Sequence, residues 1–204
     1  MLNLSTIGQL SRLVRDRRGV SAVEFAFVAP LMVTLYLGCA EISDGVAADR
    51  KVSLIAGALA NLTSSCSDSN ANSGSCAANT NPAYNITTTE MNNILDASSA
   101  IIAPYNASKL TMKLSCLKID GNGVAKVQWS APRNTTGRSV GSVYSFSSSN
   151  SALAVKNSYL ILSEVTYAYK PTVGYTITGT LTLSDQMFMA PRVSAPAYNG
   201  ITCT

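Results

Sequence analysis

A carboxylate inside an apolar segment is the most informative chemical group in this sequence. Glu24 is the single formally charged residue between Val20 and Ala40. A carboxylate at the centre of a bilayer costs roughly 2.5–3.5 kcal/mol on insertion scales, so it usually marks a function. If the chain were cut after Gly19, Val20 would carry a free ammonium group and Glu24 would be the fifth residue. An ammonium and a carboxylate on neighbouring helices can form an ion pair, whereas each is costly alone in a low dielectric.

The composition excludes several classes of chemistry. The chain has 204 residues with no histidine, 15 Lys and Arg, 11 Asp and Glu, and a net charge of +4. Without histidine, Ser-His-Asp and Cys-His nucleophile systems and His-ligated metal sites are excluded. The sequence contains no Asp/Glu cluster of the kind that a glycosidase needs, so a hydrolase that uses Asp/Glu pairs is not expected. We therefore expect neither an enzyme nor a metal or cofactor site.

The charge is concentrated before the apolar segment. Four arginines against one aspartate give the first nineteen residues a net charge of +3, and the rest of the chain is nearly neutral. A nearly neutral body does not resemble a nucleic-acid-binding surface. By the positive-inside rule, a basic cluster just before an apolar run stays in the cytoplasm and the following residues are exported. The residues that set this topology are Arg12, Arg15, Arg17 and Arg18.

The apolar segment 20–40 is long enough to cross a membrane. As a helix it would span about 30 Å, the thickness of the hydrocarbon core. Pro30 removes one backbone hydrogen bond and is expected to kink this helix. A secretory signal peptide is the main alternative, with Val46-Ala47-Ala48 as its cleavage site, but its apolar region is usually 7–15 residues long. A lipoprotein box around Cys39 fits less well. On the simplest interpretation, the Glu24 side chain snorkels toward the basic end of the segment. This would explain why a charge is tolerated there, but not the pattern of residues around Glu24.

A family resemblance follows from these residues. A basic leader that ends in Gly19, then an apolar helix with glutamate at its fifth position, resembles the processing site of type IV-type prepilins. The form Gly19-Val20, Val23-Glu24-Phe25-Ala26 and Ala29-Pro30-Leu31 resembles the TadE-like pseudopilins of the tight-adherence (Tad, Flp-type) pilus. Phe25 stands where the major Tad pilins commonly have tyrosine. The resemblance implies cleavage by a prepilin peptidase between Gly19 and Val20, and a role for Glu24 in cleavage or subunit registration.

The rest of the chain predicts a small α+β head. Residues 41–63 continue the helical pattern as a stalk, and 63–85 form a polar loop. Thr87 and Glu90 have capping-box spacing, which predicts a helix from about Thr88 to Ile102. Strand patterns predict an antiparallel hairpin over 110–117 and 124–129 and two later strands over 159–169 and 180–189. The polar, serine-rich residues 131–152 between them are expected to form a poorly ordered excursion. The domains are then leader 1–19, transmembrane helix 20–40, stalk 41–63 and head 64–204.

Four cysteines outside the membrane segment predict disulfides. An even number in an exported region is typical of an oxidising compartment, and four cysteines allow three pairings. We favour Cys66–Cys76, which closes a short loop, and Cys116–Cys203, which ties the C-terminal tail to the first strand of the head. Cys39, in the apolar run, is expected to be inert.

The sequence supports two functional hypotheses. The first is a TadE-like minor pilin in the bacterial inner membrane, single-pass, with a cytoplasmic N-terminus and a periplasmic head, and reaching the cell surface if it enters the pilus. Its partners would be other pilins or pseudopilins, the inner-membrane assembly machinery and prepilin peptidase, with no nucleic acid. The second is a membrane-anchored binding module that never polymerises and recognises a surface or glycan. Its binding residues would be Tyr144, Tyr159, Tyr167 and Tyr169.

Overall fold

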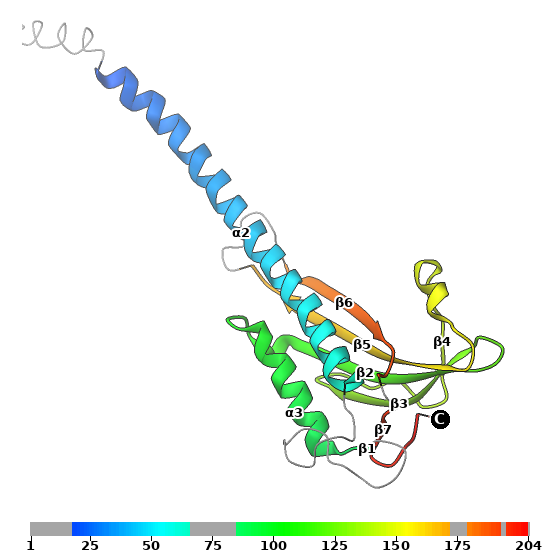
Figure 1. Cartoon of the computed structure of the whole chain (residues 1–204). Coiled ribbons are helices and arrows are strands. Elements are labelled where there is room, and N and C mark those ends of the chain that lie inside the picture. The colour runs from blue at the N-terminus through cyan, green and yellow to red at the C-terminus, as the bar shows by residue number, and fades with distance from the viewer. Residues whose placement is uncertain (1–17, 66–84, 172–178, 193–194, 204) are drawn as a thin grey trace, which may run out of the picture. The chain divides into compact units, whose positions relative to one another are not determined.

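The computed structural model describes residues 18–65, 85–171, 179–192 and 195–203 (Figure 1). The chain divides into two compact units, one of residues 1–44 with 171–178 and one of 45–170 with 179–204. In its described part, the first unit is mainly the N-terminal half of a helix. The second is an α+β head with an antiparallel sheet, which confirms the predicted fold class.

The long helix α2 runs from Arg18 to Ser64. It joins the predicted transmembrane segment and the predicted stalk without an assigned break, so both helical predictions are confirmed. Pro30 lies inside α2. Its ring removes the N–H that would bond the carbonyl of Ala26, a loss that transmembrane helices tolerate where neighbouring groups supply a partner. The kink at Pro30 stays a prediction.

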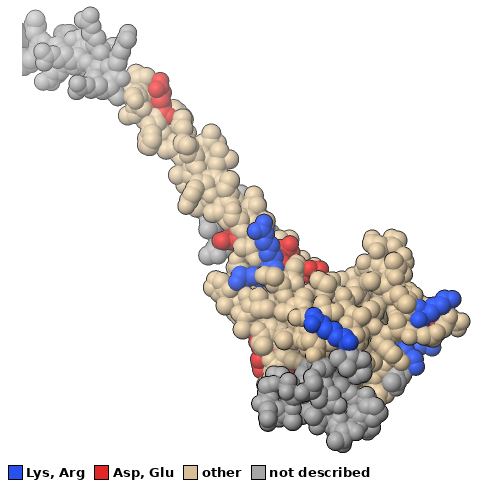
Figure 2. Space-filling model, viewed as in Figure 1, with Lys and Arg blue, Asp and Glu red and all other residues tan. Residues whose placement is uncertain are grey.

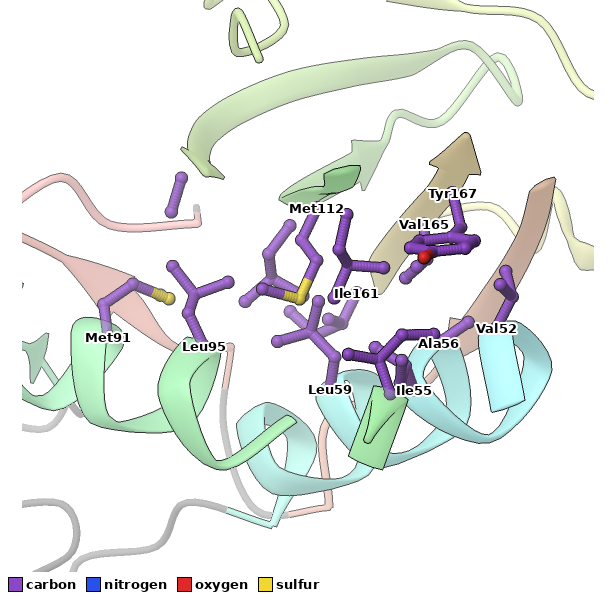
Figure 3. Close-up of a cluster of buried hydrophobic side chains, with 14 of the residues drawn as sticks. Val52, Ile55, Ala56, Leu59, Met91, Leu95, Met112, Ile161, Val165 and Tyr167 are labelled. Carbon is purple, nitrogen blue, oxygen red and sulfur yellow. The ribbon is translucent and has the colours of Figure 1, made fainter. Parts of the chain in front are cut away.

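One stripe of the C-terminal half of α2 forms the centre of the head's core. Ala48, Val52, Ile55, Ala56 and Leu59 are all fully buried. Figure 3 shows several of them facing Met112, Ile161 and Val165 of the sheet, with α3 beside them. Full burial of a Leu or Ile side chain is worth roughly 1.5–3 kcal/mol relative to exposure. This stripe therefore holds α2 on the head.

The helix α3 spans Thr88–Ser99 and begins with the predicted capping box. The Glu90 N–H donates to Thr87 Oγ1 at 3.3 Å, and the Thr87 N–H donates to Glu90 Oε2 at 2.8 Å. A turn of 3₁₀ helix, η1 (Ala100–Ile102), follows and leads to a cis Ala103–Pro104 bond. Lys51 of α2 donates to the carbonyls of Ile101 and Ala103, so the stalk satisfies the carbonyl end of this region.

The main sheet has the order β4-β3-β2-β5-β6, with every neighbouring pair antiparallel. Its strands are β2 (Leu110–Ile119), β3 (Ala125–Arg133), β4 (Val143–Tyr144), β5 (Ser158–Tyr169) and β6 (Leu181–Met189). The predicted hairpin and both later strands are confirmed. Sequence patterns had not indicated a second, parallel pair, β1 (Asn85–Ile86) with β7 (Ala197–Tyr198), nor the short 3₁₀ helix η2 (Ala107–Lys109).

A β-bulge lets β3 contribute to both apolar faces of the sheet. Cys116 pairs with Trp129 and Leu117 pairs with Val127, so Gln128 is the extra residue on β3. Trp129 consequently packs in the core with α2 and α3, while Val127 belongs to a separate cluster on the other face. Since side chains alternate along a strand, residues two apart would share a face without the bulge.

The polar segment 131–152 is more structured than the sequence predicted. Its first residues extend β3, Val143 and Tyr144 form β4, and residues Ser148–Leu153 form the 3₁₀ helix η3. Arg138 forms a bidentate ion pair with Glu164 of β5, with both N–O distances at 2.7 Å, and stacks on the Tyr144 ring. The expectation of a poorly ordered excursion was wrong, because these contacts attach the segment to the second sheet face.

The disulfide Cys116–Cys203 is present, as predicted. It joins β2 to the C-terminal region across 87 residues of sequence, and both cysteines are fully buried. Trp129 Nε1 donates to the carbonyl of Pro196 at 2.8 Å and anchors the same region. The predicted Cys66–Cys76 pair lies outside the described residues.

Removing this disulfide should destabilise the head. The double variant C116A/C203A is expected to lower the free energy of unfolding by about 2–5 kcal/mol, because the bond closes a long loop. Urea titration of the full chain in lipid nanodiscs, followed by fluorescence of Trp129, the single tryptophan, measures the effect. Cys39→Ser is the control, since Cys39 is an exposed free thiol. Equal midpoints for the double variant and the unaltered chain would contradict the assignment.

Candidate functional site

The candidate processing site lies on the first turns of α2. Gly19 and Val20 are the second and third residues of this helix, and Glu24 lies four residues beyond Val20, about 6 Å further along the axis. All three are exposed, as is Phe25. The Gly19–Val20 bond therefore lies on an exposed part of the described helix.

Apart from Glu24, residues 20–36 of α2 carry no charged side chain (Figure 2), and the rest of the described chain does not bury them. The mean hydropathy of an 18-residue window in α2 is 1.8, and none of that window is buried. Because the window is unburied, the segment is not the core helix of the head. An exposed helix that is apolar all round is typical of a membrane span. Large side chains here expose between 50% and 78% of their surface: Val20, Val23, Phe25, Phe27, Val28, Leu31, Met32, Val33, Leu35 and Tyr36.

Cleavage before Val20 would create a helix terminus that favours a nearby carboxylate. A chain that begins at Val20 would carry an ammonium group at the positive end of the helix dipole. Glu24 of the same helix lies one turn away, whereas Glu24 of a neighbouring helix offset by about 6 Å along its axis would lie level with that ammonium group. The arrangement of α2 is thus suited to an ion pair between helices.

Of the four arginines predicted to set the membrane orientation, one lies within the described residues. Arg18 is the first residue of α2. Arg12, Arg15 and Arg17 lie outside the described residues, so their role in orientation stays a prediction.

The tyrosines of the alternative binding hypothesis do not form a common exposed surface. Tyr167 and Tyr169 are each only 4% exposed and lie in the main core, where both rings pack near Tyr105 with centroids about 6 Å apart. Burial raises the pKa of the Tyr167 hydroxyl. Tyr159 is partly buried against the same core, and Tyr144 packs on the opposite face with Phe146 and Phe188. These rings stabilise the head.

The head does contain one polar feature that sequence patterns had not indicated. The Glu164 side chain holds Arg138, and this pairing raises the pKa of the guanidinium. An open depression beside it is lined by Glu164, Thr166, Ser184, Asp185 and Gln186. The sequence did not indicate this ion pair, because Arg138 and Glu164 are 26 residues apart. Among the described residues, no cluster of three potential metal ligands occurs.

The described features define a class of protein: an α+β head that continues into an exposed apolar helix of the kind that anchors proteins in membranes. Residues 19–54 match the family model described as TadE-like protein. The match confirms the resemblance predicted from Gly19 to Leu31 and supports a structural, Tad pilus-associated protein. Comparisons with curated proteins and with solved structures find no significant match.

Charges placed in the apolar part of α2 should release the chain from membranes. The double variant V28R/L31R is expected to be extracted by high-pH carbonate, because each arginine costs about 2.5–3.5 kcal/mol at the centre of a span. The unaltered chain should stay in the membrane pellet. Val143→Arg, at a head residue that is 59% exposed, is the matched control and should also stay. Full retention of the double variant would contradict the assignment of this segment.

Proposed function

We propose that the chain is a minor pilin, or pseudopilin, that is cleaved after Gly19 and takes part in assembly of an adhesive Tad-type pilus. The observation that carries the proposal is the spacing of Gly19 and Glu24 at the start of an exposed apolar helix, within the segment that matches the TadE-like model. A prepilin peptidase would remove the leader 1–19. The transmembrane segment 20–40, the stalk 41–63 and the head 64–204 would form the mature subunit.

The proposed mechanism is the exchange of lipid contacts for helix contacts. The apolar surface of α2 between Val20 and Leu37 needs an apolar environment in either place, so transfer from the membrane to a bundle costs little hydrophobic free energy. Direction and register would come from polar groups, since an unpaired Glu24 is unfavourable in both environments. An ammonium group on Val20 of a neighbouring subunit would pair with it. Other pilins or pseudopilins and the inner-membrane assembly machinery would be the partners.

The proposed location is the bacterial inner membrane, crossed once. The arginines of the leader would keep the N-terminus in the cytoplasm, and the head would lie in the periplasm. The buried Cys116–Cys203 disulfide supports this orientation, because disulfides persist in the periplasm and are rare in the cytosol. A subunit that enters the pilus would reach the cell surface.

The new N-terminus tests the cleavage step. Mass spectrometry of the chain extracted from membranes of a host with prepilin peptidase is expected to find Val20 as the first residue. Gly19→Val should leave the leader attached because it changes the residue that the peptidase recognises. A Cβ atom at Gly19 meets no atom within 4 Å, so the fold itself tolerates a side chain there.

Gly57→Ala is the matched control, since a Cβ atom at Gly57 also meets open space. This variant should be cleaved normally. A chain that still begins at Met1 would contradict cleavage after Gly19, and one that begins at Asp49 would indicate a signal peptide.

Substitution of Glu24 separates a pilin from a simple anchor. Glu24→Ala should insert into membranes as well as the unaltered chain or better, because it removes a costly charge. It should nevertheless lose processing or pili, since an unpartnered ammonium group in a low dielectric weakens helix association by about 3–5 kcal/mol. Pili are counted by electron microscopy and sheared filaments are quantified by immunoblot.

The control is Ser21→Ala, an exposed residue on the same turns of α2. It should leave pilus number unchanged. Normal cleavage and normal pili in Glu24→Ala would favour the membrane-anchored binding module over a pilin.

A further inference from the structure

The strand β6 lies at one margin of the described sheet and has a regular edge. It pairs with β5 over nine consecutive residue pairs without a bulge, from Leu181 with Tyr169 to Met189 with Ile161. Among the described strands, nothing pairs with its other side. Sheet proteins usually block such edges with lysine, proline, bulges or short strands. The sequence of β6, LTLSDQMFM, contains neither lysine nor proline, and Asp185 is its single charged residue.

The opposite edge of the same sheet is blocked. Pro132 lies in β3 and removes a backbone donor there. Further along β3, Ala125 and Lys126 pair with β4, and Val127 exchanges backbone hydrogen bonds with Gly141 and Ser142. Figure 1 shows β4 and β6 on opposite margins of the sheet. The contrast shows that the open edge at β6 is not a general property of this sheet.

Side chains on the two faces of β6 define what the edge can accept. Leu181 and Met187 lie on the face that carries the main core, yet remain 42% and 37% exposed. Ser184 and Gln186 lie on the other face, opposite Thr166 and Glu164, and line the open depression. The edge therefore offers apolar contacts on the core face, where the carboxylate of Asp185 lies between them, and polar contacts on the other face.

The charge beside this edge is negative and incompletely paired. Both oxygens of Glu164 are engaged by Arg138. Asp185 Oδ1 accepts from the Gln186 N–H at 2.7 Å, and no cation pairs with Asp185 among the described residues. A lysine or arginine is the side chain that this position would attract.

We propose that β6 binds an extended segment of a different polypeptide, which adds as a sixth strand, packs apolar side chains on Leu181 and Met187, and places a basic side chain at Asp185. A second copy fits less well. Its β3 edge is blocked, and two-fold antiparallel pairing of the full length of β6 would centre on Asp185. The two Asp185 carboxylates would then lie opposite each other, and like charges directly opposite are destabilising. The proposal does not depend on cleavage after Gly19.

The test uses the full chain in lipid nanodiscs and a labelled nine-residue peptide of alternating Thr and Val with a central Lys. Fluorescence anisotropy should show saturable binding. A peptide with a central Glu should bind about threefold more weakly or worse, and Asp185→Asn should weaken binding of the Lys peptide by a similar factor. A peptide with alternate N-methylated amides should not bind, because it lacks the donors of a sheet ladder.

Variants of the edge complete the test. Met187→Lys and Gln186→Pro should each abolish binding, while Val143→Lys on the opposite edge should bind as the unaltered chain does. Circular dichroism melting identifies any variant that fails to fold. If Gln186→Pro does not fold, Met187→Lys still tests the proposal, because it changes a partly exposed residue. Absence of saturable binding, or equal loss in Val143→Lys, would overturn the proposal. A dimer in native mass spectrometry that Met187→Lys dissociates would also overturn it, since the edge would then belong to a second copy.

Discussion

The structure depends on one constraint: a single helix must satisfy two different environments along its length. From Gly45 to Ser64, one side of α2 is buried by the sheet and by α3, and the head folds around it. Between Val20 and Tyr36, the same helix presents large apolar side chains that the described chain does not cover. Hydrophobic burial holds the first part within the molecule, and the second part requires lipid or other helices.

This division separates the proposed role of Glu24 from the role of the head. In an uncovered apolar segment, the proposed ion pair of Glu24 would set the register of neighbouring helices, because its pairing is directional and van der Waals contacts are not. The head has the features of a stable support: a buried disulfide, a capped helix and aromatic residues that pack in cores rather than on the surface. The candidate site and the scaffold thus lie on separate parts of α2.

Sequence patterns predicted the elements with strong local signals. The capping box of Thr87 and Glu90 gave the start of α3, and alternation gave β2, β5 and β6. The pairing of Cys116 with Cys203 was preferred among three possibilities and is present. The Gly19–Glu24 spacing gave the TadE-like resemblance that the family model matches. Each of these signals depends on residues close together in the sequence or on a small set of cysteines.

Long-range polar contacts could not be predicted in the same way. Arg138 and Glu164 pair across 26 residues, and their interaction organises a segment whose serine-rich composition indicated disorder. The parallel β1–β7 pair joins residues more than one hundred positions apart, with two residues in each strand and therefore no detectable alternation. The order of the strands, and hence the open edge at β6, likewise follows from tertiary packing.

The bulge at Gln128 also bears on how this head can change. Residues of β3 on either side of it face different cores. Deletion of Gln128 would make Val127 and Trp129 consecutive residues, which keeps them on opposite faces, whereas deletion of another residue of β3 would turn part of the strand to the wrong face. Loops of the head can gain or lose residues without such an exchange of faces. Length variation among descendants of this chain should therefore accumulate in the connections between strands and, within β3, be confined to the bulge.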